Sequence, residues 1–112
     1  MVNDSNVLVH KAICEELNAL YKRKNADYGD SFHLSYLDEG MAMSRIRLGD
    51  KLNRFKTLTR NAGVSMVNDE SVRDTLIDLA NYAIMTIIEI DRADSKLGIR
   101  YSHTDAFDDD MK

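Results

Sequence analysis

The sequence predicts an all-α protein with three long helices that pack as a bundle. The chain has 112 residues with no proline and only five glycines, so it lacks most of the turn signals of an all-β protein. Its apolar residues, 44 % of the total, recur at steps of three and four along three stretches, as they do on one face of a helix. The length predicts a single domain, residues 1–95, followed by an acidic C-terminal tail, residues 96–112.

The first predicted helix spans residues 4–24, with Asp4 or Ser5 available as its N-cap. Residues 25–36 then interrupt the helical period with aspartate, glycine and serine. A merely flexible loop rarely contains many aromatic residues, but this segment has three, Tyr28, Phe32 and Tyr36. We therefore expect an ordered connection, whose aromatic side chains either bind a ligand or hold the loop on the core.

The second and third predicted helices span residues 38–61 and 69–93. Gly63 follows the second as a stop signal, and Asn68 precedes the third as an N-cap. Ten of the thirteen residues 76–88 are apolar, and they point in nearly every direction around the helix axis. Such a helix is buried on all sides. We therefore expect a homodimer or a higher homo-oligomer, whose subunits together form a bundle of four or more helices.

Composition excludes several classes of function. A formal charge of −4 provides no basic field for duplex nucleic acid, and no apolar run approaches the roughly 20 residues that span a membrane. The single cysteine, Cys14, cannot form an internal disulfide, and the N-terminus lacks the pattern of a signal peptide. These features predict a cytoplasmic protein.

The third predicted helix carries a stripe of acids. Glu70, Asp74 and Asp78 follow one another at steps of four residues, and Asn81 falls within the same sector of the helix. Like charges at this spacing repel one another by a few tenths of a kcal/mol per pair. We therefore expect basic side chains or a metal ion to offset them.

Asp78 and Asn81 also interrupt an apolar stretch, so their polar groups need partners. The second helix provides cations and one acid, and two interpretations stay open. The first is a buried ion-pair network with a structural role. The second is a Mg²⁺ site, because this ion prefers oxygen ligands and bridges carboxylates to the phosphates of a substrate. Its ligands would be Asp50, Asp74 and Asp78.

Three strings in the chain resemble a known family. They are KNADYGDSF at residues 24–32, RLGDKLNRFKTL at residues 47–58 and DESVRDTLIDLANYAIM at residues 69–85. They resemble the phage and prophage family called nucleotide modification associated domain 1, and they cover most of residues 22–88. That family is in turn similar in helical layout to the MazG-like all-α nucleoside triphosphate pyrophosphatases. The resemblance implies a phage-type protein whose partner is a small-molecule nucleotide.

In MazG-like enzymes, an ExxE and an ExxD motif on two helices bind Mg²⁺, and water attacks the α–β phosphate bond to release pyrophosphate and a nucleoside monophosphate. This sequence departs from that pattern. Asp78 matches the aspartate of the second motif, but Thr75 replaces its glutamate. Asp50 keeps one acid of the first motif, but Arg47 replaces the other. The resemblance therefore favours nucleotide binding and leaves catalysis open.

The leading hypothesis is Mg²⁺-dependent hydrolysis of a (deoxy)nucleoside triphosphate to monophosphate and pyrophosphate. In this hypothesis the three aspartates hold Mg²⁺ and Glu70 accepts a proton from the attacking water. The residues expected to bind the substrate are Lys24, Arg47, Lys51 and Arg54 for phosphate, Tyr28 and Phe32 for stacking on the base, and Asn81 for a hydrogen bond to the sugar or base. The alternative is a protein without turnover that binds and sequesters a nucleotide, for example one used in defence signalling.

Overall fold

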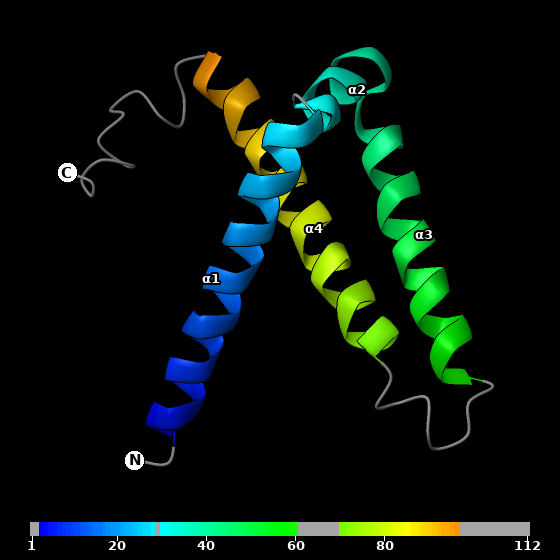
Figure 1. Ribbon diagram of the computed structural model, residues 1–112. Helices are drawn as coiled ribbons and strands as arrows, with labels where there is room; N and C mark the ends of the chain where they lie inside the picture. Colours follow the sequence, from blue (N-terminus) through cyan, green and yellow to red (C-terminus); the bar gives the residue numbers. More distant parts are fainter. Residues whose placement is uncertain (1–2, 29, 61–69, 97–112) are drawn as a thin grey trace.

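The computed structural model describes residues 3–28, 30–60 and 70–96. All regular structure in these segments is helical, which confirms the predicted fold class. The helices are α1 (Asn3–Tyr28), α2 (Ser31–Glu39), α3 (Met41–Arg60) and α4 (Glu70–Lys96). In Figure 1, α3 and α4 lie side by side and run in opposite directions, while α1 crosses α4 and α2 joins the upper ends of α1 and α3.

The prediction of three helices is one helix short. The segment 25–36 was expected to be irregular, but α1 continues to Tyr28 and α2 begins at Ser31. A helix of nine residues is not stable alone in water, so its contacts with other helices must hold it. One such contact is the Phe32 ring, which stacks on Tyr82 of α4 with 6.0 Å between the ring centroids. The pattern of apolar residues within α2 does not predict this contact, because the partner of Phe32 lies in α4.

The start of α3 also differs from the prediction. Gly40 ends α2 with a positive φ of 69°, and its N–H donates to the carbonyl oxygen of Tyr36 over 2.7 Å. Side chains with a Cβ rarely adopt this left-handed conformation, so glycine suits the position. As a result, α3 begins at Met41 and not at residue 38.

Other predicted helix ends shift by a few residues. α1 begins at Asn3, so the expected caps Asp4 and Ser5 lie inside the helix. α4 continues to Lys96, three residues beyond the expected end. The predicted stop at Gly63, the predicted cap at Asn68 and residues 97–112 of the predicted tail lie outside the described residues.

Few hydrophobic side chains are buried in the described part of the chain. Those below a tenth exposed are Leu17, Met43, Val72 and Ile77. The inner face of α4 is instead rich in polar groups that find partners. The Thr86 hydroxyl donates to the Ser44 hydroxyl of α3 over 3.1 Å, and the Asn81 amide donates to the Leu17 carbonyl of α1 over 3.2 Å.

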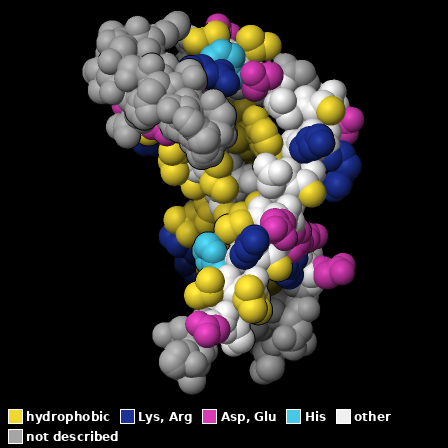
Figure 2. Space-filling view, turned by 90° about the vertical axis from the view of Figure 1, so that its left-hand side faces the viewer, with side chains coloured by type: hydrophobic (Ala, Val, Ile, Leu, Met, Phe, Trp, Pro, Cys, Tyr) yellow, Lys and Arg dark blue, Asp and Glu magenta, His cyan; other side chains and the backbone are white. Residues whose placement is uncertain are grey.

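The outer face of α4 remains exposed in the single chain. Its large hydrophobic side chains, 40–55 % exposed, are Leu76, Ile84, Ile87 and Ile90. The expectation that this helix is buried on all sides is therefore not met within one chain. Hydrophobic side chains are also exposed beside charged ones on the face that Figure 2 presents. None of the described helices combines the length and hydropathy needed to cross a membrane.

A polar contact holds α2 on α4. His33 Nδ1 lies 2.8 and 3.0 Å from the two carboxyl oxygens of Glu89, whose side chain is 6 % exposed. Arg92 approaches the same carboxyl group more loosely, at 3.6 Å. His33 is therefore the main partner that compensates the burial of Glu89, and the contact fixes α2 above the upper part of α4.

Replacing His33 by alanine should destabilise the fold. The His33→Ala variant leaves the buried Glu89 carboxyl group with Arg92 alone, which should cost about 1–3 kcal/mol of unfolding free energy. Urea denaturation followed by circular dichroism measures this. The matched control is His10→Ala on the exposed part of α1, which should change stability by less than about 0.5 kcal/mol. Equal effects of the two variants would contradict the role of the His33 contact.

A second polar contact joins α1 to α4 at the molecular surface. Arg73 donates from both guanidinium nitrogens to the two carboxylate oxygens of Glu16, each over 2.7 Å. These hydrogen bonds favour the charged form of Glu16 and hold its pKa below the ordinary value of 4.5.

This lowered pKa predicts a dependence of stability on pH. Because Glu16 has the lower pKa in the folded state, its contribution is complete above about pH 4.5 and is lost as the pH falls through the folded pKa. Thermal unfolding between pH 7 and pH 3 should therefore show a smaller acid-induced decrease in Tm for Glu16→Gln than for the wild type. The neighbouring variant Glu15→Gln should retain the wild-type profile, and an unchanged Glu16→Gln profile would refute the coupling.

Candidate functional site

Asp78 lies where α1, α3 and α4 meet. Its two carboxylate oxygens each face a lysine: Lys24 of α1 at 3.6 Å and Lys51 of α3 at 3.2 Å. The Asp78 side chain is only 26 % exposed, so part of its hydration is replaced by these two cations. Asp78 is therefore an ion-pair partner, as the first interpretation of the sequence expected: its carboxylate lies between two positive charges.

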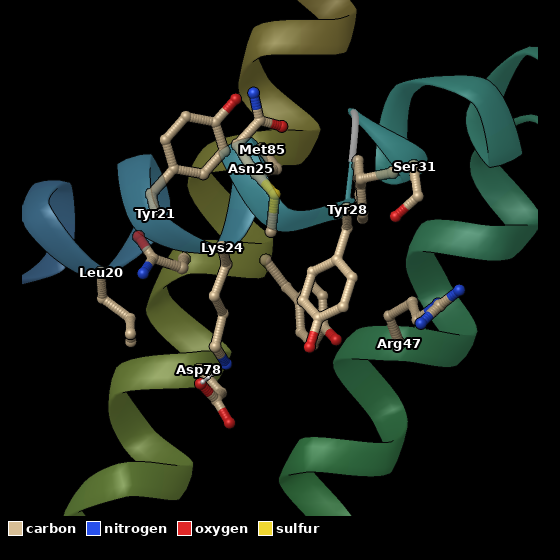
Figure 3. Close-up of a pocket in the computed structure, with 12 residues that line it drawn as sticks. Leu20, Tyr21, Lys24, Asn25, Tyr28, Ser31, Arg47, Asp78 and Met85 are labelled. Carbon is tan, nitrogen blue, oxygen red and sulfur yellow. Dashed lines mark ion pairs between the residues drawn. The ribbon is translucent and has the colours of Figure 1, made fainter.

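A cavity of about 240 Å³ opens beside this cluster, between the C-terminal part of α1, the start of α2, α3 and α4. It is lined by Leu20, Tyr21, Lys24, Asn25, Tyr28, Ser31, Phe32, Arg47, Asp78, Asn81, Tyr82 and Met85. Figure 3 shows the Lys24 side chain reaching from α1 to Asp78 on α4, with the Tyr28 ring on the side nearer α3. Six residues predicted from the sequence to belong to the site share this lining: Lys24, Tyr28, Phe32, Arg47, Asp78 and Asn81.

Aromatic rings form much of the cavity wall. Phe32 and Tyr82 stack on each other with 25° between their planes, so they present a fixed apolar surface. The predicted role of Phe32 in holding its segment on the core agrees with this contact, and it does not prevent contact with a ligand. Tyr28 is 67 % exposed, so its ring can turn onto a planar ligand without leaving a packed position.

Two amide side chains provide hydrogen-bonding groups in the same cavity. Asn81 is 8 % exposed and uses its amide nitrogen to donate to the Leu17 carbonyl, which leaves its own carbonyl oxygen as an acceptor. Asn25 lines the cavity from α1. Amides of this kind can pair with the donor and acceptor edge of a heterocyclic base.

A second cavity of about 440 Å³ lies between α1 and α4. It shares Leu20, Lys24 and Asp78 with the first cavity, so a ligand that occupies both must pass Lys24 and Asp78. The other lining residues are Glu16, Ala19, Arg23, Asp74 and Ile77. Together the two cavities reach the range of about 300–1,000 Å³ that is usual for small-molecule sites.

Positive charge is concentrated around the two cavities. Five cations line them or pair with their acids, namely Arg23, Lys24, Arg47, Lys51 and Arg73. They face three carboxylates, namely Glu16, Asp74 and Asp78. The whole chain carries a formal charge of −4, so this local excess is opposite in sign to the rest of the protein. Such a field favours an anionic ligand.

Four of the predicted site residues are outside the lining of both cavities: Lys51, which reaches the site through its contact with Asp78, and three that have no such contact with a lining residue among those described. Asp50 and Arg54 are exposed on α3, outside the lining of either cavity. Glu70, the first residue of α4, is also exposed and is about 12 Å from Asp78 along the helix axis. The predicted roles of these residues as metal ligand, phosphate contact and general base stay predictions.

The acids near the cavities suit a particular mode of magnesium binding. Mg²⁺ usually takes one or two carboxylates and completes its coordination with waters and substrate phosphates. Asp74 and Asp78 lie one turn apart on α4 and both line the second cavity, so they fit this mode. Within the described residues, no group of three or more histidine, cysteine or acidic side chains could hold a metal ion.

Several lining residues were not predicted from the sequence. Tyr82 and Met85 follow Asp78 by four and seven residues, so helical spacing alone could have placed them on its face of α4. Tyr21 and Asn25 precede Tyr28 by seven and three residues on α1, and the same argument finds them once α1 is known to reach Tyr28. Glu16, Arg23 and their cavity depend on how α1 crosses α4, and no sequence signal gives that crossing.

The family comparison agrees with the resemblance seen in the sequence. Residues 24–90 match the family described as nucleotide modification associated domain 1. This segment is more than half of the chain, and it contains every residue that lines the first cavity except Leu20 and Tyr21. No curated protein and no solved structure matches the chain. The name of the family links it to nucleotide modification, and from the extent of the match we conclude that the chain belongs to the nucleotide modification associated domain 1 family.

Proposed function

We propose that the protein binds a nucleotide in the two joined cavities. The observation that supports this most strongly is the position of Asp78, whose single negative charge is shared by Lys24 and Lys51 beside Arg47 and an aromatic wall. The two lysines carry two positive charges and Asp78 carries one negative charge, so one positive charge is not neutralised. A phosphate group in the cavity would neutralise it. The family name supports a nucleotide over other phosphorylated ligands.

The side chains that line the two cavities indicate how the nucleotide is oriented, with its base in one cavity and its phosphates in the other. The base lies in the first cavity, against Tyr28 and the stacked Phe32, where each stacking contact contributes roughly 1–3 kcal/mol. The Asn81 carbonyl oxygen accepts a hydrogen bond from the base or the sugar. The phosphates extend past Lys24 into the second cavity, where Arg23 adds a further cation.

The second candidate function is hydrolysis of a nucleoside triphosphate to monophosphate and pyrophosphate. It is favoured by Asp78, which lies where the two cavities adjoin, and by Asp74, which lines the second cavity one helical turn away. The proposed similarity to MazG-like pyrophosphatases points to the same reaction. Asp74 and Asp78 would hold Mg²⁺ together with phosphate oxygens, and the ion would supply charge neutralisation and activation of water.

Several side chains of the protein would also take part in this reaction. Water adds to the α-phosphorus, the bond from that phosphorus to the bridging oxygen breaks, and pyrophosphate leaves with the electron pair. Lys51, which contacts Asp78 where the cavities adjoin, stabilises the charge that develops on the phosphoryl oxygens, and Arg47, which lines the first cavity, contacts the phosphate nearest the base. Lys24 forms the longer contact with Asp78 and its side chain is 53 % exposed, so it can release the carboxylate to Mg²⁺ and turn to a phosphate. Glu70 is proposed to accept the proton of the water once the site is occupied.

Nucleotide binding predicts a selective effect of Lys24. Thermal shift with a panel of nucleotides, followed by calorimetry on the best binder, should show that Lys24→Met raises Kd roughly ten- to a hundredfold, because a charge-assisted hydrogen bond contributes about 1.5–3 kcal/mol. The matched control is Lys22→Met, two residues away and outside both cavities, which should change Kd by less than about twofold. Equal effects of the two substitutions, or no binding across the panel, would rule out this site.

Hydrolysis predicts a different effect of Asp78. Pyrophosphate release in Mg²⁺ should fall by about 100-fold or more in Asp78→Asn, since metal-assisted charge stabilisation contributes several kcal/mol. The exposed Asp38→Asn on α2 serves as the control and should keep the wild-type rate. If the wild type binds a nucleotide with no metal-dependent pyrophosphate release, sequestration is the function and the hydrolase proposal fails.

A further inference from the structure

The two joined cavities differ in the charge of the side chains that line them. Lys24 and Asp78 line both cavities. The first cavity adds one cation, Arg47, and no further acid, so its lining carries more positive than negative charge. The second cavity adds one cation and two acids, so negative charge is in excess in its lining. These three residues are Arg23, Glu16 and Asp74. The positive field around the site is therefore strongest at the first cavity.

Two neighbouring ion pairs modify this difference but do not remove it. Lys51 lies 3.2 Å from Asp78 and follows Arg47 by one helical turn on α3, so it adds positive charge on the side of the first cavity. No residue of α3 is among the described residues that line the second cavity. Arg73 donates to both carboxylate oxygens of Glu16 and thereby neutralises that acid. The first cavity thus keeps an excess of positive charge, and the second cavity has none.

Asp74 is the acid of the second cavity whose charge is least balanced. Within residues 3–28, 30–60 and 70–96, no cation forms an ion pair with Asp74, whereas Glu16 and Asp78 each have partners. Arg73 precedes Asp74 in the chain, but the hydrogen bonds of its guanidinium group to Glu16 are the main cause of the raised pKa of Arg73, and Asp74 is a minor one. Asp74 therefore presents a negative charge that is not neutralised to any ligand in the second cavity.

A nucleotide that lies across the junction of the cavities meets these charges in order along its phosphate chain. The phosphate nearest the base lies beside Lys24, Arg47 and Lys51. The further phosphates of a triphosphate extend into the second cavity, where Arg23 attracts them and Asp74 repels them. The first phosphate therefore gains most of the electrostatic attraction, and each added phosphate brings more negative charge next to a carboxylate.

We propose that the protein without a divalent cation prefers a nucleoside monophosphate to the corresponding triphosphate, and that Asp74 sets this preference. The inference rests on the proposed function, because it names the class of nucleotide that the same site takes. Asp74 is exposed, so water and salt screen its charge, and the preference amounts to roughly three- to tenfold in Kd. In the second candidate function the monophosphate is the product, so this preference would keep the product bound after pyrophosphate leaves.

The first test compares the mono- and triphosphates of the common ribo- and deoxynucleosides by calorimetry in EDTA, which removes divalent cations. For the wild type, the triphosphate should have the higher Kd by roughly three- to tenfold. Asp74→Asn should bring the ratio of the two Kd values to about one, because the amide keeps the shape of the side chain without its charge. The matched control is Asp38→Asn on α2, exposed and outside both cavities, which should keep the wild-type ratio. Tighter binding of the triphosphate by the wild type, or equal ratios in the two variants, would overturn the proposal.

A second measurement tests whether charge, and not shape, causes the preference. Raising the ionic strength from about 0.02 M to about 0.5 M shortens the distance over which charges act, so the ratio of the two Kd values for the wild type should fall towards one. A constant ratio would mean that the second cavity is too narrow for further phosphates. A ratio that increases with salt would mean that these phosphates are attracted there. Either result would refute the role of Asp74.

The same titrations separate this inference from the proposed function. If the mono- and triphosphates bind equally well to the wild type, the nucleotide site stands and the role of Asp74 in selectivity is wrong. If no nucleotide of either class binds, the proposed function fails, and this inference fails with it.

Discussion

The contact of Asp78 with Lys24 and Lys51 is the constraint on which the rest of the structure depends. It is the point at which α1, α3 and α4 come within ion-pair distance of one side chain. A partly exposed ion pair adds little net free energy, since the Coulomb attraction is offset by desolvation and side-chain entropy. Its importance lies in position. It brings one side chain from each of the three helices to a single point beside the two cavities.

The same contact explains why the fold and the candidate site cannot be separated. A partly exposed acid between two lysines has a structural role as long as no ligand is present, and a phosphate group would change the charge balance around it. The helix that bears Asp78 is polar on its inner face and apolar on its outer face. The polar residues of α4 thus lie on the side of the cavities, and few of the hydrophobic side chains in the described segments are buried.

The sequence predicted the helical class and the approximate positions of α1, α3 and α4, because these are long segments with a clear apolar period. It did not predict α2, since the nine residues of this helix depend on Phe32 and His33, whose partners lie about 50 residues away in α4. Spacing along a helix indicates which residues share a face. It therefore identified Asp78, Asn81 and the cations that lie beside them.

Spacing along one helix does not give the offset between two helices. The role of Asp50 as a metal ligand beside Asp74 and Asp78 stays a prediction, whereas its neighbour in sequence, Lys51, is the α3 residue whose side chain contacts Asp78. A step of one residue rotates a side chain by about 100°, which is enough to exchange an acid for a cation at a contact. Of the four rings that line the first cavity, Tyr28 and Phe32 were expected from the sequence, because they are aromatic residues in a segment that otherwise resembles a loop, whereas Tyr21 and Tyr82 were missed because they lie within helices.

The turn at Gly40 restricts how the chain length between α2 and α3 can change in evolution. It separates α2, which is held on α4, from α3 by one residue with a positive φ. An insertion or deletion there would change the connection between α2 and α3, and so disturb the packing that places Arg47 and Lys51 on one side of α3. Chain length between residues 39 and 41 should therefore be invariant among relatives that keep the same ligand, whereas the identity of most exposed residues on α2 is free to drift.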